Sequence, residues 1–131
     1  MNLRAVATLT LDGGAKTVTV AGTEVILQKY FVNPGKREMK AVLSPIWGGA
    51  ASDSGTFDYK LQDANTTVDS DFSDISGATF TQVSGDSDNT GATAEAIHFF
   101  TAKQYVRGYS TFAGTGTYYV AATLFAMKRD A

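Results

Sequence analysis

The sequence predicts an all-β fold, an antiparallel β-sandwich or jelly roll in a single domain. Its 131 residues include 17 threonines and 13 glycines but only two prolines. Threonine favours strands, and both threonine and glycine disfavour helices. Glycine-containing turn signals also recur at short intervals along the whole chain. Such spacing suits two antiparallel sheets that share one core better than a parallel sheet, whose crossovers need helical segments.

About nine β-rich runs are predicted as strands. In residues 57–61, for example, Phe57, Tyr59 and Leu61 share one face of the strand because successive side chains alternate. Residues 94–101 could also form a short helix, because periodicity does not decide so brief a run. In chain order the predicted strands are residues 3–10, 16–20, 23–28, 37–43, 57–61, 79–83, 94–101, 104–110 and 117–127. The turns expected between them lie at residues 12–14, 33–35, 48–49, 76–77, 84–85 and 114–116.

Composition excludes several function classes. The net charge is −2 with a sequence pI of about 5.2, whereas a general nucleic-acid binder is normally basic. The absence of cysteine excludes disulfides, thiolate catalysis and cysteine-ligated metal sites. No apolar run approaches the roughly 18 residues that span a bilayer, and no signal peptide is recognisable. We therefore expect a soluble domain made inside the cell, with neither a nucleic acid nor a membrane as its partner.

The charged residues are distributed unevenly. Residues 53–95 contain nine acids and the single base Lys60, so the flanking segments contain the other ten bases and four acids. One interpretation is a set of solvated loops. The other is a domain with an acidic and a basic face, which would orient it on a charged partner or let neighbouring copies pair.

Candidate catalytic and metal sites are weak. His98 is the only histidine, and no Gly-x-Ser-x-Gly elbow accompanies it, so a packed or surface histidine is favoured over a hydrolase triad. Residues 86–91 resemble the start of a calcium loop, but Ile97 stands where a bidentate glutamate is needed. A turn is favoured there over a weak calcium site, and the same holds for Asp69, Asp71 and Asp74. No carboxylate pair or phosphate loop is recognisable, so the sequence predicts no enzyme, cofactor or metal.

Aromatic residues are the remaining candidates for binding. Trp47 lies in the loop-like segment 44–49, either packed over a sheet end or presented to a partner. Tyr105, Arg107 and Tyr109 share one face of their predicted strand by its period of two. If exposed, such a face could bind a sugar, stack a base or form a protein interface; a partly buried sheet face is the alternative.

Several stretches together resemble the small head decoration, or cement, proteins of tailed bacteriophages. The similarity covers residues 36–131, whereas residues 1–35 match less clearly. Its pieces agree with that family in order and spacing. They are Lys-Arg-Glu-Met-Lys-Ala-Val-Leu at 36–43, Gly-Thr-Phe-Asp-Tyr-Lys-Leu-Gln-Asp at 55–63, Phe-Ser-Asp-Ile-Ser-Gly-Ala at 72–78, Lys-Gln-Tyr-Val-Arg at 103–107 and Thr-Tyr-Tyr-Val-Ala-Ala-Thr-Leu at 117–124.

The resemblance implies a jelly roll or related β-sandwich that binds the outside of an assembled capsid. It implies a trimer at three-fold and quasi-three-fold positions, with the major capsid protein and its own copies as partners. The expected location is the outer surface of the virion, after assembly in the host cytoplasm, and no enzyme activity is implied.

The residues expected to contact the partner are chosen by residue type. Lys36, Arg37 and Trp47 come first, followed by Tyr105 and Arg107. The alternative function is a carbohydrate-binding or receptor-binding β-sandwich module of a phage tail, with Trp47, or Tyr105 and Tyr109, as the stacking platform.

Overall fold

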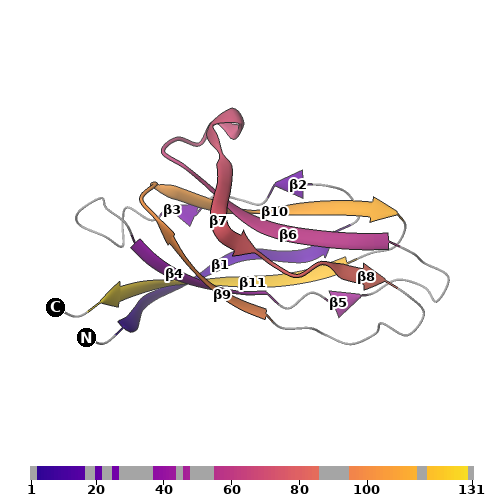
Figure 1. Cartoon of the computed structure of the whole chain (residues 1–131), viewed down its shortest axis with the longest axis horizontal. Helices are drawn as coiled ribbons and strands as arrows, with labels where there is room; N and C mark the ends of the chain where they lie inside the picture. The colour runs from indigo at the N-terminus through magenta and orange to yellow at the C-terminus, as the bar shows by residue number, and fades with distance from the viewer. Residues whose placement is uncertain are drawn as a thin grey trace.

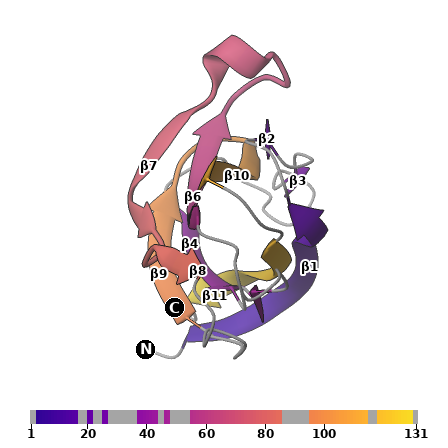
Figure 2. The same cartoon turned by 90° about the vertical axis from the view of Figure 1, so that its right-hand side faces the viewer.

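The chain folds into two antiparallel sheets packed face to face (Figures 1 and 2). The computed structural model describes the backbone of residues 3–16, 20–21, 25–26, 37–43, 46–47, 55–85, 95–114 and 118–129. The degree of burial is described for residues 55–82, 95–114 and 122–125. These residues confirm the predicted all-β sandwich. None of the helical segments among them has the length and apolar character needed to cross a membrane.

The first sheet, called sheet A, is built around the pair β11 and β4. Its strand order is β1 (Leu3–Lys16), β11 (Tyr118–Arg129), β4 (Arg37–Leu43) and β9 (Glu95–Thr101). The short strand β5 (Ile46–Trp47) also pairs with β11. Because Leu43 lies opposite Ala122 and Ile46 opposite Tyr119, β5 continues β4 along β11 without a change of register.

The second sheet, called sheet B, is built around the pair β10 and β6. Its strand order is β2 (Val20–Ala21), β10 (Tyr105–Gly114), β6 (Gly55–Ala64) and β7 (Ser73–Thr79). Two further short strands extend it: β3 (Val25–Ile26) pairs with β10, and β8 (Val83–Gly85) pairs with β6. A single 3-10 turn, η2 (Asp69–Asp71), lies between β6 and β7.

Strand pairing is nested along the sequence. β1 pairs with β11, β2 and β3 with β10, β4 with β9, and β6 with β7 and β8. The chain is thus one long antiparallel hairpin wrapped across two sheets, which is the arrangement of a jelly roll. β7 also contacts β9 and closes one side of the sandwich, as the end-on view shows (Figure 2).

The core between the sheets is aromatic. Phe57, Tyr59 and Leu61 of β6 are at most 1% exposed, which confirms that these three side chains share the buried face. The rings of Phe57 and Tyr59 lie 6.1 Å apart, and Tyr59 lies 5.8 Å from Phe80. On β10, a Cβ added to Gly108 would lie 1.6 Å from the Tyr59 hydroxyl oxygen, so a glycine is needed opposite that ring.

Most predicted strands are confirmed, in whole or in part. In the predicted segment 94–101, the described residues 95–101 form strand β9 and not a helix, because residues 37–43 supply a partner strand along their full length. Of the predicted strand at 16–20, only Lys16 in β1 and Val20 in β2 lie within the described residues. The predicted strand at 23–28 is represented there by β3.

Five expectations were wrong. The turns expected at residues 76–77 and 84–85 lie within strands β7 and β8, because β6 supplies a partner strand for both. The turn expected at residues 12–14 is part of β1, because β11 runs on beside it and a register shift between Thr10 and Asp12 absorbs the irregularity. The strand expected at 79–83 is interrupted: β7 ends at Thr79, residues 80–82 belong to no strand, and β8 begins at Val83. The segment around Trp47 is not a loop at that residue, whose backbone pairs with Tyr118 in sheet A.

Candidate functional site

The outer face of sheet B brings together the polar and aromatic residues that the sequence analysis grouped. Arg107 lies opposite Gln62, and Tyr109 lies opposite Lys60, in the β10–β6 ladder. Neighbouring residues of β6, such as Leu61, are buried in the core, so these side chains point away from it. The predicted common face of Tyr105, Arg107 and Tyr109 is therefore correct.

Arg107 is enclosed although it lies on the outer face. The residue is 4% exposed, because the chain between β6 and β7 folds over it. Its guanidinium carbon lies 4.1 Å from the centroid of the Phe72 ring, a cation–π geometry. Its Nε donates to Gln62 Oε1 at 3.0 Å, and its Nη1 lies 2.6 Å from Asp69 Oδ1. These partners compensate the cost of removing the cation from water.

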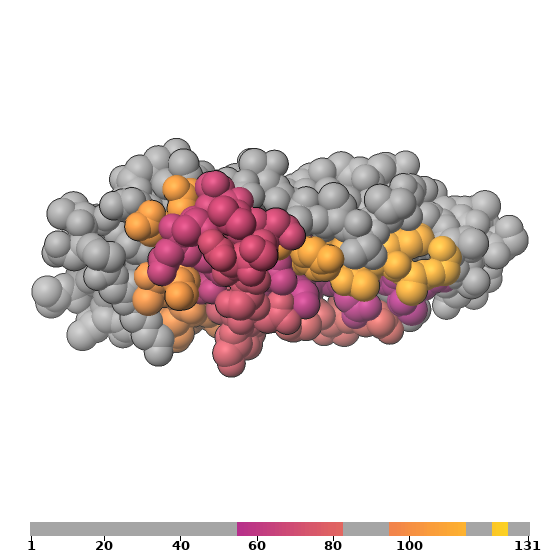
Figure 3. All heavy atoms as spheres, turned by 90° about the horizontal axis from the view of Figure 1, so that it is seen from above, coloured from indigo at the N-terminus to yellow at the C-terminus, as the bar shows by residue number. Residues whose placement is uncertain are grey.

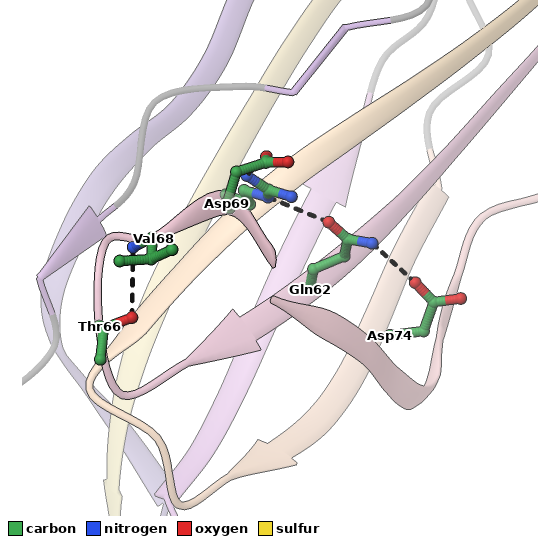
Figure 4. Close-up of polar contacts among 6 residues, drawn as sticks. Gln62, Thr66, Val68, Asp69 and Asp74 are labelled. Carbon is green, nitrogen blue, oxygen red and sulfur yellow. Dashed lines mark hydrogen bonds and ion pairs between the residues drawn. The ribbon is translucent and has the colours of Figure 1, made fainter. Parts of the chain in front are cut away.

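The hydrogen bonds continue from Arg107 across the sheet to β7. Gln62 Nε2 donates to Asp74 Oδ1 at 2.9 Å, and Lys60 Nζ lies 2.9 Å from Asp74 Oδ2 (Figure 4 shows Gln62 and Asp74). The hydrogen bond from Gln62, followed by that from Lys60, holds the pKa of Asp74 below its ordinary value of 3.8. Asp74 is therefore ionised at neutral pH, and β10, β6 and β7 are linked by one polar chain.

Residues 65–72, which connect β6 to β7, form a projection that we call the knuckle. Figures 1 and 2 show it rising from the outer side of sheet B, and in Figure 3 it lies in front of the sheet with atoms of segment 95–114 visible on either side. Val68 N donates to Thr66 Oγ1 at 3.2 Å, a local turn of the kind that threonine favours (Figure 4). Thr66 Oγ1 donates to Asp71 Oδ2 at 2.5 Å, and Asp71 N donates to Val68 O at 3.0 Å.

The knuckle is thus stabilised by hydrogen bonds among its own residues and by the contacts of Asp69 and Phe72 with Arg107 of sheet B. Its outer residues remain in solvent: Val68 is 56% exposed, and the Asp69 side chain is 85% exposed. Val68 and Phe100 are the exposed large hydrophobic residues of the part of the chain whose side chains are described.

The five residues expected to contact a partner do not form one cluster. Tyr105 and Arg107 lie on β10 in sheet B, with Tyr105 half-buried and Arg107 buried. Arg37 and Trp47 lie on β4 and β5 in sheet A, where their backbones pair with Thr101 and Tyr118.

Lys36, the fifth of these residues, lies outside the described residues. Arg107 is enclosed by partners within the chain, so it has a packing role and is not available to contact a partner.

The residues considered for catalysis or metal binding have other environments. His98 is exposed on β9, and its ring lies 5.4 Å from that of Phe100. Asp69 and Asp74 bind Arg107, Gln62 and Lys60, as described above. Among the described residues, no group of three or more His, Cys, Asp or Glu side chains could hold a metal ion. The calcium-like segment 86–91 lies outside them.

Sequence reasoning missed the residues that build this face around Arg107. Phe72, Gln62 and Val68 were not singled out, although Phe72 provides the ring that covers the guanidinium. A buried arginine on the outer face of a strand needs a side chain packed over its guanidinium and a hydrogen-bond acceptor. The sequence offered both at residues 69–74, where Phe72 has acidic residues on both sides.

No protein-family model matches the sequence. No curated protein matches it either. Among solved structures, the chain is similar to the CBM22-1–GH10 modules of Clostridium thermocellum xylanase 10B complexed with xylohexaose, at 10% identity and a TM-score of 0.42. That match covers 95% of this chain and 26% of the xylanase chain, so this chain spans a minor part of it.

Two further solved structures are similar to this chain, one a carbohydrate-binding domain and one from a virus. One is the CBM22-1 xylan-binding domain from Paenibacillus barcinonensis Xyn10C, at 7% identity and a TM-score of 0.48, covering 98% of this chain and 97% of that one. The other is a chain of Desmodium yellow mottle tymovirus, at 11% identity and a TM-score of 0.31, covering 99% and 87%. The jelly roll itself follows from the strand pairing described above.

Proposed function

We propose that this chain is a capsid decoration protein that binds the outer surface of a mature bacteriophage head and stabilises the shell. It binds as a homotrimer at three-fold and quasi-three-fold positions. Its partners are then the major capsid protein and further copies of itself. In this role it is a structural protein of the virion, with no enzymatic activity, cofactor or nucleic-acid partner.

One observation carries this proposal: the segments that resemble phage decoration proteins are adjacent in the fold. Of segments 36–43 and 117–124, the described residues 37–43 and 118–124 lie in β4 and β11, the central pair of sheet A. Segment 55–63 lies in β6, and segment 103–107 leads into β10, its partner at the centre of sheet B. Segment 72–78 covers most of β7 beside them. A resemblance spread along the sequence thus maps onto the connected centre of both sheets.

The physical requirements of the role agree with such a domain. A decoration protein bridges neighbouring shell subunits, and three linked copies multiply weak individual contacts by avidity. A jelly roll has open sheet edges, and association with other copies or with the shell would cover them.

Co-sedimentation with purified shells tests the proposal. The protein is mixed with mature, expanded capsids and with unexpanded procapsids of the source phage at low and moderate salt, and bound copies per shell are counted. We expect saturable binding to the mature shell at a copy number that matches its three-fold positions. Absence of binding to both shells would contradict the proposal.

The contact residues are mapped in the same assay. Lys36→Ala, Arg37→Ala and Trp47→Ala are expected to weaken binding, followed by Tyr105→Ala. Lys103→Ala, which removes one positive charge from an exposed position, is the matched control. Equal binding by Lys36→Ala, Arg37→Ala and the control would exclude these two basic residues as contacts.

A second candidate function is carbohydrate or receptor binding by a module of a phage tail. The observation that favours it is the pair of half-buried rings, Tyr105 and Tyr109, on the outer face of sheet B beside Gln62. Against it, Lys60 and Arg107 lie 5.5 Å and 5.9 Å from the centroid of the Tyr109 ring, so cations already occupy its surroundings. No signal on a glycan array, together with unchanged tryptophan fluorescence on adding host polysaccharide, would reject this candidate.

A further inference from the structure

The knuckle combines an unusually well-held backbone with an exposed apolar residue. Burying the Arg107 cation is costly unless partners compensate it, and two of its partners, Asp69 and Phe72, belong to the knuckle. Connections between strands are usually the more mobile parts of a fold. This one is instead fixed on the sheet in a defined position.

A fixed projection favours binding because less conformational entropy is lost when a partner is engaged. The knuckle meets this condition by two independent sets of contacts. Thr66, Val68 and Asp71 are joined to one another by hydrogen bonds. Arg107 ties Asp69 to sheet B, and the Phe72 ring, 9% exposed, packs against the guanidinium.

The surface that the knuckle presents defines the chemistry of its partner. Val68, 56% exposed, is the apolar residue of the otherwise polar segment 65–71. Asp69 and Asp71 lie one and three residues after it, and no lysine or arginine occurs between Lys60 and Lys103 in the sequence. Arg107 pairs with Asp69 but is itself buried, so the exposed charges of the knuckle are acidic. Lys60 itself is paired with Asp74. The complementary surface is therefore an apolar recess bordered by lysine or arginine side chains.

Resting on the function proposed above, we propose that the knuckle docks this protein on the shell, in addition to the contacts expected at Lys36, Arg37, Trp47 and Tyr105. Val68 enters an apolar recess of the shell protein, and the acidic side chains around it face basic residues at the rim of that recess. The occupant is thus a protein surface of the shell, and Arg107 is the positioning residue that holds the knuckle for it.

Three variants of the full chain test the docking role in the co-sedimentation assay. Val68→Ser removes the exposed apolar side chain. Ser70→Lys places a positive charge between Asp69 and Asp71 at an exposed position, without removing a hydrogen bond of the knuckle. Phe100→Ser is the matched control, because Phe100, 41% exposed on β9 of sheet A, is the other exposed large hydrophobic residue among the side chains whose burial is described. Thermal unfolding checks that each variant is folded, and sedimentation velocity gives its oligomeric state.

We expect Val68→Ser to bind mature shells about tenfold more weakly than the wild type, as for a central apolar contact. Ser70→Lys should weaken binding most at low salt, with the difference shrinking as salt screens the rim charges. Phe100→Ser should bind within about twofold of the wild type. This combination, with an unchanged oligomeric state, supports the docking role.

The contrary outcomes are distinct. If the wild type binds mature shells and both knuckle variants bind equally well, the knuckle is not the docking element, while the decoration function stands. If Val68→Ser instead dissociates the free oligomer, the knuckle joins copies of this chain, and docking on the shell is overturned. If the wild type binds no shell, the decoration function is wrong and the docking role falls with it.

Discussion

Arg107 illustrates how one side chain is placed by partners that are distant in sequence. Its ionic partner, Asp69, lies 38 residues away, and its hydrogen-bond partner Gln62 lies 45 residues away. The two members of the ion pair also differ in environment, since the Arg107 side chain is 5% exposed and that of Asp69 is 85% exposed. The pair is therefore better described as a buried arginine with one solvated partner than as a buried salt bridge.

This asymmetry predicts unequal effects of removing the two partners. Arg107→Ala should lower the free energy of unfolding by about 2 to 3 kcal/mol, because Gln62 loses a donor and the Phe72 ring loses its packing partner. Asp69→Ala should cost less, about 1 kcal/mol, because the carboxylate is 85% exposed and water can take its place beside Arg107 Nη1. Urea unfolding at pH 7 measures both. A larger loss for Asp69→Ala than for Arg107→Ala would contradict this account of the pair.

At the scale of elements, β7 is the least regular strand of sheet B. On β6 only one residue separates Lys60 from Gln62, but their partners on β7 are Thr79 and Asp74, so β7 contains an extended bulge. Gly77 lies in this bulge with a φ of 77°, and a Cβ at that position would meet nothing within 4 Å. The requirement for glycine there is conformational and not steric.

Gly77→Ala should therefore destabilise the protein by about 1 kcal/mol through backbone strain alone. Gly77→Asn should cost less, since asparagine tolerates the left-handed region better than alanine does. The free energy of unfolding of the two variants, measured by urea titration, checks the order. An effect of Gly77→Asn equal to or greater than that of Gly77→Ala would show that the position is limited by packing.

The bulge also explains which elements could be predicted. A strand with a regular period of two, such as residues 57–61, can be predicted because alternation is a local pattern. In and around β7 the buried residues are Phe72, Ile75, Ala78 and Phe80, a spacing that no regular strand gives. A bulge is decided by the neighbouring strand, which a local pattern does not contain.

At the scale of the whole molecule, the two sheets are joined by polar as well as apolar contacts. Thr101, at the end of β9 in sheet A, is 3% exposed and donates from Oγ1 to Asp63 Oδ2 on β6 in sheet B at 2.6 Å. The same oxygen accepts from the backbone N–H of Lys103 at 3.1 Å. One hydroxyl thus links both sheets and the turn that follows β9.

Thr101→Val keeps the shape of this side chain and removes both hydrogen bonds. We expect a loss of about 1 to 2 kcal/mol in the free energy of unfolding, because Asp63 loses a donor in a partly buried place. Thr101→Ser, which retains the hydroxyl, should remain closer to the wild type. Chemical unfolding at neutral pH distinguishes the two. If Thr101→Val is as stable as the wild type, the link between the sheets does not contribute to stability.

The sequence by itself determined the class of fold and the faces of its regular strands. Threonine and glycine content excluded long helices, and alternation placed Tyr105, Arg107 and Tyr109 on one side of β10, as the register confirms. Only the tertiary structure decided which of those faces is covered. Residues of segment 65–72 pack over Arg107 and bury it. Alternation along a strand predicts the face on which a side chain lies, but not which other segment packs against that face.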